Sequence, residues 1–156
     1  RASTTRWQLL NPRWPEGFAM KTAAETVNNS TTLQNDDHLF FAVDASTDYE
    51  FEFKIFLTTP VAAAFKATLT GPASPTLINV LTEDVADSTS TVDIKTAFSF
   101  SHVVTPVSAE RAYVSYTGIL HNGVNAGTVR LQWAQNVATV GDTAVRKGST
   151  LRYNML

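Results

Sequence analysis

Hydrophobic and polar residues alternate with a period of two along several stretches of the chain, most clearly in YEFEFKIFLT, residues 49–58. Side chains on a strand point alternately to opposite faces. Phe51 and Phe53 therefore fall on one face of this segment, whereas Glu50 and Glu52 fall on the other. The pattern predicts a strand with one face in the hydrophobic core and one face in solvent.

The same alternation recurs in HLFFAV, AFKATLTG, AFSFSHVV, RAYVSYTGIL, TVRLQWAQ and STLRYNML. In TVRLQWAQ it predicts that Leu131 and Trp133 are core residues. Gln135 and Asn136 follow, and we expect them to turn the chain through hydrogen bonds from side chain to backbone. The whole stretch is therefore interpreted as framework.

Turn-forming residues separate these strands, in DAST, TGPASP, EDVADSTST, HNGVNAG and VGDTAVRKGS. Gly, Pro, Asn, Asp and Ser supply the backbone angles and local hydrogen bonds that turns require. Many short strands with regular turns between them predict an all-β protein. An antiparallel jelly-roll-like β-sandwich is the architecture that we favour.

The first 31 residues lack this alternation and contain two prolines and several large apolar side chains, which a disordered tail does not usually hold. We divide the chain into an extended N-terminal arm, residues 1–31, and a β-sandwich domain, residues 32–156. Two interpretations of the arm stay open. It covers an open edge of its own sandwich, or it reaches a neighbouring subunit, which we favour. The residues predicted to anchor it on a partner are Trp7, Leu9, Leu10, Trp14 and Phe18.

Composition excludes several classes of function. The net charge of −2 provides no positive field for a phosphate backbone, so we expect no nucleic-acid partner. The chain has no cysteine and therefore no disulfide or thiolate metal site. Its apolar runs are far shorter than the roughly 20 residues of a membrane-spanning helix, so we expect no membrane partner.

Residues that could carry metal or acid–base chemistry are scattered. NDDH, residues 35–38, joins two carboxylates to an imidazole, but neighbours on a strand point to opposite faces. We interpret it as a solvated turn before a strand. His102 lies on the apolar phase of its strand and is interpreted as a buried, hydrogen-bonded histidine, and His121 as a surface turn residue. None of them is predicted to bind a metal.

Glu50 and Glu52 share a strand face, as a pair of catalytic carboxylates would, but their regular alternation with aromatic residues is more typical of the solvent side of a strand. A nucleophile elbow, a phosphate-binding glycine loop and a dinucleotide fingerprint are all missing from the sequence. We therefore predict neither catalytic residues nor a cofactor, and a protein that is not an enzyme.

Two segments carry a resemblance to a known group of proteins. LQWAQN at residues 131–136, followed by GS and Leu at residues 148–151, resembles the C-terminal part of small tailed-bacteriophage virion structural proteins. The segment TLQNDDHLFFAVDASTDYEFEFKIFL, residues 32–57, is similar to the same group. The resemblance implies a β-sandwich structural module, usually trimeric, on a phage particle, and it brings no catalytic residues.

Two functions fit this resemblance. The first is a capsid decoration, or cement, protein that binds the major capsid protein as a homotrimer and stabilises the capsid surface through its arm, after assembly in the host cytoplasm. The alternative is a tail-fibre, head-fibre or receptor-binding module whose loops HNGVNAG and EDVADSTST contact a host glycan or protein. The chain lacks the long shaft that usually carries a fibre tip, which favours the decoration protein.

Overall fold

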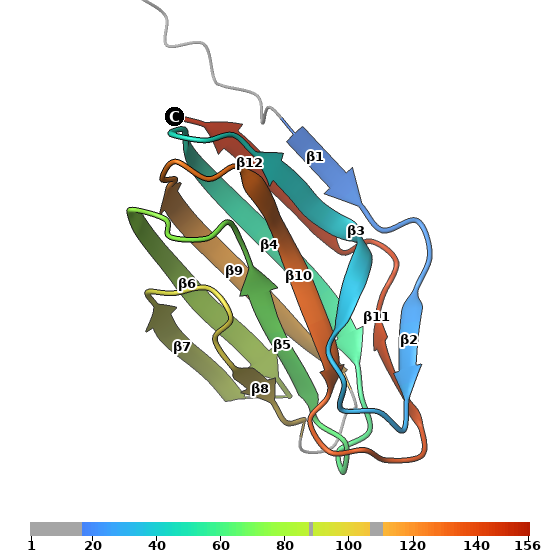
Figure 1. Ribbon diagram of the computed structural model, residues 1–156. Coiled ribbons are helices and arrows are strands. Elements are labelled where there is room, and N and C mark those ends of the chain that lie inside the picture. Colours follow the sequence, from blue (N-terminus) through green and yellow to red (C-terminus); the bar gives the residue numbers. More distant parts are fainter. Residues whose placement is uncertain (1–16, 88, 107–110) are drawn as a thin grey trace, which may run out of the picture.

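The computed structural model describes residues 17–87, 89–106 and 111–156, which form strands joined by turns and loops. In chain order the strands are β1 (Gly17–Met20), β2 (Glu25–Asn28), β3 (Gln34–Val43), β4 (Asp48–Thr58), β5 (Phe65–Thr70), β6 (Leu77–Ala86), β7 (Thr89–Lys95), β8 (His102–Val104), β9 (Arg111–His121), β10 (Gly127–Gln135), β11 (Asp142–Val145) and β12 (Thr150–Met155). They build two antiparallel sheets that lie face to face (Figure 1). The predicted all-β sandwich is therefore confirmed.

The strand order identifies the sandwich as a jelly roll. One sheet has the order β3-β10-β5-β8, and the other contains the run β4-β9-β6-β7. The antiparallel pairs β3 with β10, β4 with β9, β5 with β8 and β6 with β7 are what a long hairpin forms when it folds over into two sheets. On the other side of β4, the larger sheet continues through β12 to β1, and β11 joins both β4 and β2.

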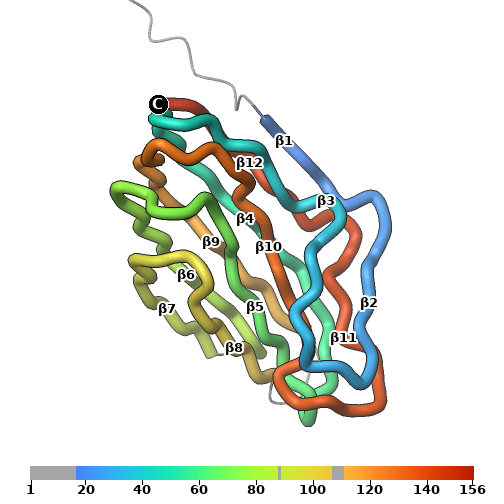
Figure 2. Tube along the Cα trace, in the orientation of Figure 1, coloured from blue at the N-terminus to red at the C-terminus, as the bar shows by residue number. Residues whose placement is uncertain are grey.

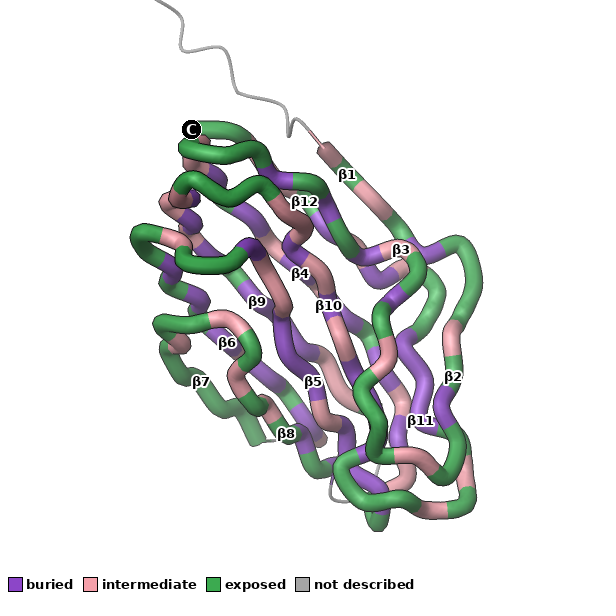
Figure 3. Tube along the Cα trace, in the orientation of Figure 1, coloured by how far each residue is buried: buried purple, intermediate pink, exposed green. Residues whose placement is uncertain are grey.

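The core lies between the two sheets and is built by the alternation that the sequence displays. Phe51 and Phe53 point into it from β4, and Leu131 and Trp133 point into it from β10, and all four are buried. The ring of Trp133 stacks on Phe65 with centroids 6.0 Å apart. In Figure 3 the buried positions run along the middle strands of both sheets, whereas β7 is exposed along its length.

Residues 17–31, the described part of the predicted arm, contribute two strands to the larger sheet. β1 pairs with β12, so that Gly17 lies opposite Tyr153, and β2 pairs with β11. The sandwich therefore already includes Gly17, well before the predicted boundary at residue 31. The two strands have four residues each, which is too short for a period of two to be recognised, and their partners lie at the far end of the sequence.

Three stretches differ from the sequence-based assignment. EDVADSTST, predicted as a turn, forms the end of β6 and the start of β7. VGDTAVRKGS, also predicted as a turn, contains β11, and in AFSFSHVV regular strand is confined to β8, residues 102–104. Polar side chains on inward-facing positions of β6 and β7 hide the alternation that would have predicted these strands.

The turn after β10 is held by one buried side chain. The Gln135 amide donates to the carbonyls of Thr139 and Gly141 at 3.1 and 2.8 Å, and its oxygen accepts from the N–H groups of Ser30 and Thr139. Gln135 thereby joins the loop after β10 to the strand connection after β2. The predicted turning role is confirmed for Gln135, whereas Asn136 is exposed and is held through its backbone N–H, which donates to the carbonyl of Ala64 at 3.1 Å.

Among the described residues, no helix is long and apolar enough to cross a membrane.

Candidate functional site

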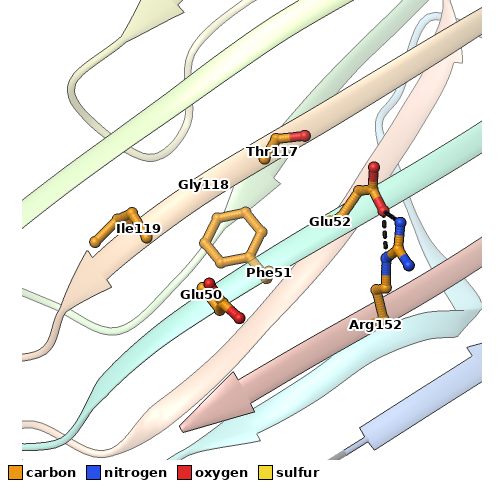
Figure 4. Close-up of a pocket in the computed structure, with 7 residues that line it drawn as sticks. All are labelled: Glu50, Phe51, Glu52, Thr117, Gly118, Ile119 and Arg152. Carbon is orange, nitrogen blue, oxygen red and sulfur yellow. Dashed lines mark hydrogen bonds and ion pairs between the residues drawn. The ribbon is translucent and has the colours of Figure 1, made fainter. Parts of the chain in front are cut away.

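The outer face of the larger sheet, which points away from the smaller sheet, carries a shallow hollow of about 310 Å³. Glu50 lies opposite Ile119 in the register of β4 and β9, and Glu52 lies opposite Thr117. Figure 4 shows these two rows on either side of the hollow, with Arg152 of β12 beside Glu52. Three neighbouring strands therefore line it.

The two glutamates of the hollow are engaged by neighbouring strands. The guanidinium of Arg152 on β12 binds Glu52 through two nitrogens, and Nζ of Lys54, on the same strand as Glu52, lies 3.4 Å from that carboxylate. The Asn154 amide donates to Glu50 at 2.6 Å. Such cross-strand pairs stabilise the register of a sheet. The pattern agrees with the interpretation of Glu50 and Glu52 as the solvent side of β4.

A glycine shapes the sheet beneath the hollow. Gly118 lies opposite Phe51, and a Cβ built on Gly118 would lie 2.3 Å from the Phe51 ring. The ring therefore occupies the space that a side chain at position 118 would fill. It is itself packed against Phe41 and Phe53, with both centroid distances 5.9 Å.

Large apolar side chains are exposed on the same outer face. Phe56 contacts Tyr113 at a centroid distance of 5.5 Å, and Tyr113 lies opposite Val85. We call the following residues the outer apolar patch: Phe56, Leu81, Val85, Val92, Ile94 and Tyr113. Val92 and Ile94 are 61% and 63% exposed. Exposed apolar groups gathered on one face are typical of a protein–protein contact surface.

The edge strand β7 combines this apolar outer face with charges on its other face. Lys95 binds Asp93, and the N–H of Ile94 donates to the same carboxylate at 2.7 Å. Both contacts lower the pKa of Asp93 below its ordinary value. Charges on an edge strand protect it from uncontrolled pairing with other chains, so β7 is better suited to contacts through its outer face.

Of the residues predicted to anchor the arm, Phe18 is described and the other four, Trp7, Leu9, Leu10 and Trp14, lie outside the described residues. Phe18 lies on β1 opposite Arg152, which places it on the outer face, and it is 63% exposed. Met20 follows on the same face and is also exposed. The Phe18 side chain therefore points away from the core, whereas the backbone of β1 pairs with β12 and covers an edge of its own sandwich, as the first interpretation of the arm predicts for this part.

His102 is held between the two sheets by two hydrogen bonds. Its Nε2 lies 3.0 Å from Oδ1 of Asp84 on β6, and its Nδ1 lies 3.0 Å from the hydroxyl of Tyr116 on β9. Burial, with a contribution from the Asp84 charge, raises the pKa of Tyr116 far above its ordinary value. The prediction of a hydrogen-bonded, largely buried histidine is confirmed, because its side chain is 10% exposed.

The interpretation of NDDH as a solvated turn is wrong. Asp36 lies within β3 and is completely buried, and so is Lys21, whose Nζ lies 2.8 Å from Asp36 Oδ2. The same Nζ lies 2.8 Å from Oε2 of Glu25 on β2. The carboxylate needs this partner because burying an unpaired charge is very costly. No local signal revealed it, since the lysine lies in a different strand connection.

The loop HNGVNAG, predicted to contact a receptor, uses its amides internally. Asn122 is buried, and its side-chain amide donates to the carbonyls of Asp44 and Asn125 at 2.6 and 2.9 Å. The Asn125 amide donates to the carbonyl of Ala73 at 2.9 Å. These groups join three loops at one end of the sandwich, and the side-chain nitrogen of each asparagine is already engaged by backbone.

Histidine and carboxylate groups do not gather into a metal site in the part of the chain that the structure describes. His121 pairs with Asp48 at 2.8 Å on the surface. His38 lies in β3, where its backbone N–H donates to Asp36.

No family model and no curated protein matches the chain. Among solved structures, the chain is similar to one in a structure of the infectious bursal disease virus Gx strain, with 10% sequence identity and a TM-score of 0.22. The similarity covers 94% of this chain and 44% of the viral chain, so this chain spans less than half of its length. A likeness of this strength is too weak to carry a functional inference.

Proposed function

We propose that the chain is a structural protein of a tailed-bacteriophage virion, and specifically a decoration protein that binds the capsid surface as an oligomer. A homotrimer is the proposed state, and the major capsid protein is the proposed partner. Residues that precede β1 would make the capsid contact, and the jelly roll would form the body of the module.

The observation that carries this proposal is the accumulation of exposed apolar side chains on one face. Phe18 and Met20 lie near one end of the larger sheet, and Val92 and Ile94 lie at the other end, all on the outer face. A protein that acts alone in solution rarely exposes so many large apolar groups on one side. Subunit and capsid contacts would remove them from water. Jelly rolls are common in virion proteins, although the fold alone does not define a function.

Co-sedimentation with undecorated heads of the encoding phage tests the capsid role. The full chain is compared with a chain that starts at Gly17, which keeps both short strands and the buried lysine. We expect the full chain to bind to saturation at a fixed ratio to the major capsid protein, and the shorter chain to stay folded but lose binding. Binding by both chains contradicts the role of the arm, and binding by neither favours the fibre or receptor-binding alternative.

Light scattering coupled to size exclusion tests the oligomer. Phe56→Glu places a charge in the outer apolar patch, and Val124→Glu places the same charge on an exposed loop at 83% exposure. We expect the first variant to be a folded monomer and the second to remain trimeric. An unchanged oligomer in Phe56→Glu would remove the patch from the proposed interface.

A further inference from the structure

Lys21, Glu25 and Asp36 form a cluster in which an amine and a carboxyl group are held in contact. The Nζ of Lys21 lies 2.8 Å from both Asp36 Oδ2 and Glu25 Oε2. The carboxyl carbon of Asp36 is one bond beyond Oδ2, which places it about 3–4 Å from Nζ, and a near-attack geometry needs roughly 3–3.5 Å. Lys21 and Asp36 are both completely buried.

The backbone around Asp36 is arranged to receive negative charge. The register between β3 and β10 shifts, since Phe40 lies opposite Arg130 whereas Asn35 lies opposite Gln132, which releases the residues between from regular pairing. The N–H groups of His38 and Leu39 both donate to Oδ1 of Asp36, at 3.0 and 2.9 Å. Two backbone donors on one carbonyl oxygen are the arrangement that stabilises the oxyanion of acyl transfer.

Hydrogen bonds also hold Lys21 and Glu25 in place. The N–H of Lys21 donates to the carbonyl of Ser149, and the Lys21 carbonyl accepts from Gly148, which fixes its backbone against the turn before β12. Gln34 donates to Oε1 of Glu25, which leaves Oε2 for the lysine and for the N–H of Asp37. Figure 2 shows the connection from β1 to β2 passing beside β3.

We propose that Lys21 and Asp36 condense to an isopeptide bond, with Glu25 as the proton carrier. The lysine ammonium first passes one proton to Asp36 Oδ2, which lies 2.8 Å away, and this produces a neutral amine and a neutral carboxylic acid. The Nζ lone pair then forms a bond to the carboxyl carbon, and the carbonyl electron pair moves to Oδ1. The N–H groups of His38 and Leu39 stabilise that oxyanion.

Glu25, whose Oε2 lies 2.8 Å from Nζ, next accepts a second proton from Nζ and passes it to the hydroxyl at Oδ2. The electron pair on Oδ1 re-forms the carbonyl while the bond between the carboxyl carbon and Oδ2 breaks, and water leaves. Nζ keeps one of its three hydrogens, so an ammonium and a carboxylate become one amide and one water, with no oxidant, reductant or other reactant. The amide joins β3 to the connection between β1 and β2, and it depends in no way on the proposed virion role.

The intact mass of the purified full chain tests this bond. We expect a mass lower than that of the sequence by one water molecule. After digestion, trypsin leaves Lys21 uncleaved, and cleavage after Glu25 leaves the two resulting peptides joined through Lys21 and Asp36. A folded chain that keeps the full sequence mass after prolonged incubation at growth temperature would overturn the proposal.

Variants separate the bond from other dehydrations. Lys21→Arg should keep the full mass, whereas the control Lys54→Arg, on a lysine that lies beside Glu52 at the surface, should still lose water. Loss of water that persists in Lys21→Arg would locate the reaction elsewhere and refute the assignment.

Two further variants keep the test decisive if Lys21→Arg does not fold. Asp36→Asn should lose one ammonia in place of one water, because the leaving group changes from hydroxyl to amine. Glu25→Gln changes a partly exposed side chain and should slow bond formation by roughly 10²–10⁴-fold, the usual contribution of general acid–base catalysis. A bond that forms equally fast in Glu25→Gln would refute the role of Glu25 as the proton carrier.

Discussion

Replacing Gly118 by alanine tests how tightly the larger sheet packs beneath the hollow. The new Cβ would lie 2.3, 2.7 and 2.9 Å from three carbons of the Phe51 ring, whereas carbon atoms prefer separations of roughly 3.5–4.0 Å. The ring would therefore have to move by about 1 Å. Phe41 and Phe53 pack against it, so the movement disturbs the core.

The magnitude follows from two opposing effects. Forcing an extra methyl group into a packed core costs about 1–3 kcal/mol. Alanine regains about 0.5–1 kcal/mol, because glycine is unfavourable within a strand. We expect Gly118→Ala to lower the free energy of unfolding by about 1–2 kcal/mol. Urea denaturation followed by tryptophan fluorescence measures this change.

A double-mutant cycle attributes the loss to the ring. Phe51→Leu removes the ring atoms that the new methyl group meets, so the two substitutions together should cost less than the sum of the single ones by about 1 kcal/mol. Thr117→Ala on the exposed face of the same strand is the control and should change stability by less than about 0.5 kcal/mol. Strict additivity, or a negligible effect of Gly118→Ala, would refute this account.

Three further predictions concern buried polar groups and the first strands. Folding raises the pKa of Tyr116, so this group does not change the free energy of unfolding below pH about 10, the pKa of tyrosine in the unfolded chain. Above that pH the free energy of unfolding should fall by up to about 1.4 kcal/mol per pH unit. Tyr116→Phe should flatten this slope in alkaline denaturation curves. The buried hydroxyls of Thr59 and Thr143 lie 2.7 Å apart, so either single change to valine should lower the free energy of unfolding by about 1–3 kcal/mol and the double change by much less. A double change that costs as much as the two single changes together in urea denaturation would contradict the pairing. A chain starting at Thr32 leaves the charge of Asp36 buried without its lysine, a loss of about 3–5 kcal/mol, and should lack a cooperative thermal transition by circular dichroism, whereas a chain starting at Gly17 keeps one.

The sequence predicted the strands in which apolar and polar residues alternate strictly, so that one face is buried in the core. Phe51 and Phe53, with Leu131 and Trp133, alternate with polar residues and lie in the core. In these segments local pattern and tertiary environment agree, because each strand is central in its sheet. His102 was also predicted well, since a single polar group on an apolar phase needs internal hydrogen-bond partners.

Elsewhere, the environment of a residue depended on a partner far away in the sequence. The sequence predicts that Asp84 is part of a polar turn, yet Asp84 is buried and His102 binds it across the sandwich. The sequence predicts that Asp36 is exposed to solvent, yet Lys21, in the connection between β1 and β2, binds it. A single sequence does not show which charged residues will pair in the fold, so the residues of a buried ion pair are predicted to be exposed.

The apolar outer face of β7 was missed for a different reason. On β7, Val92 and Ile94 point outward while Asp93 and Lys95 lie on the other face, which reverses the polarity expected of a strand that covers a core. Sequence alternation predicts that one face is apolar, but it does not say whether that face meets the core, a partner or water.

The pairing of β12 with β1 and β4 also sets the order in which the chain can fold. Contacts such as Asn154 with Glu50 and Arg152 with Glu52 join residues 104 and 100 positions apart. During synthesis β4 emerges long before β9 and β12, the strands that flank it in the finished sheet. Non-local pairing of this kind makes folding slow and leaves apolar strands exposed while they wait. The chain should therefore depend on chaperones, or on fast release from the ribosome, far more than a helical protein of equal length.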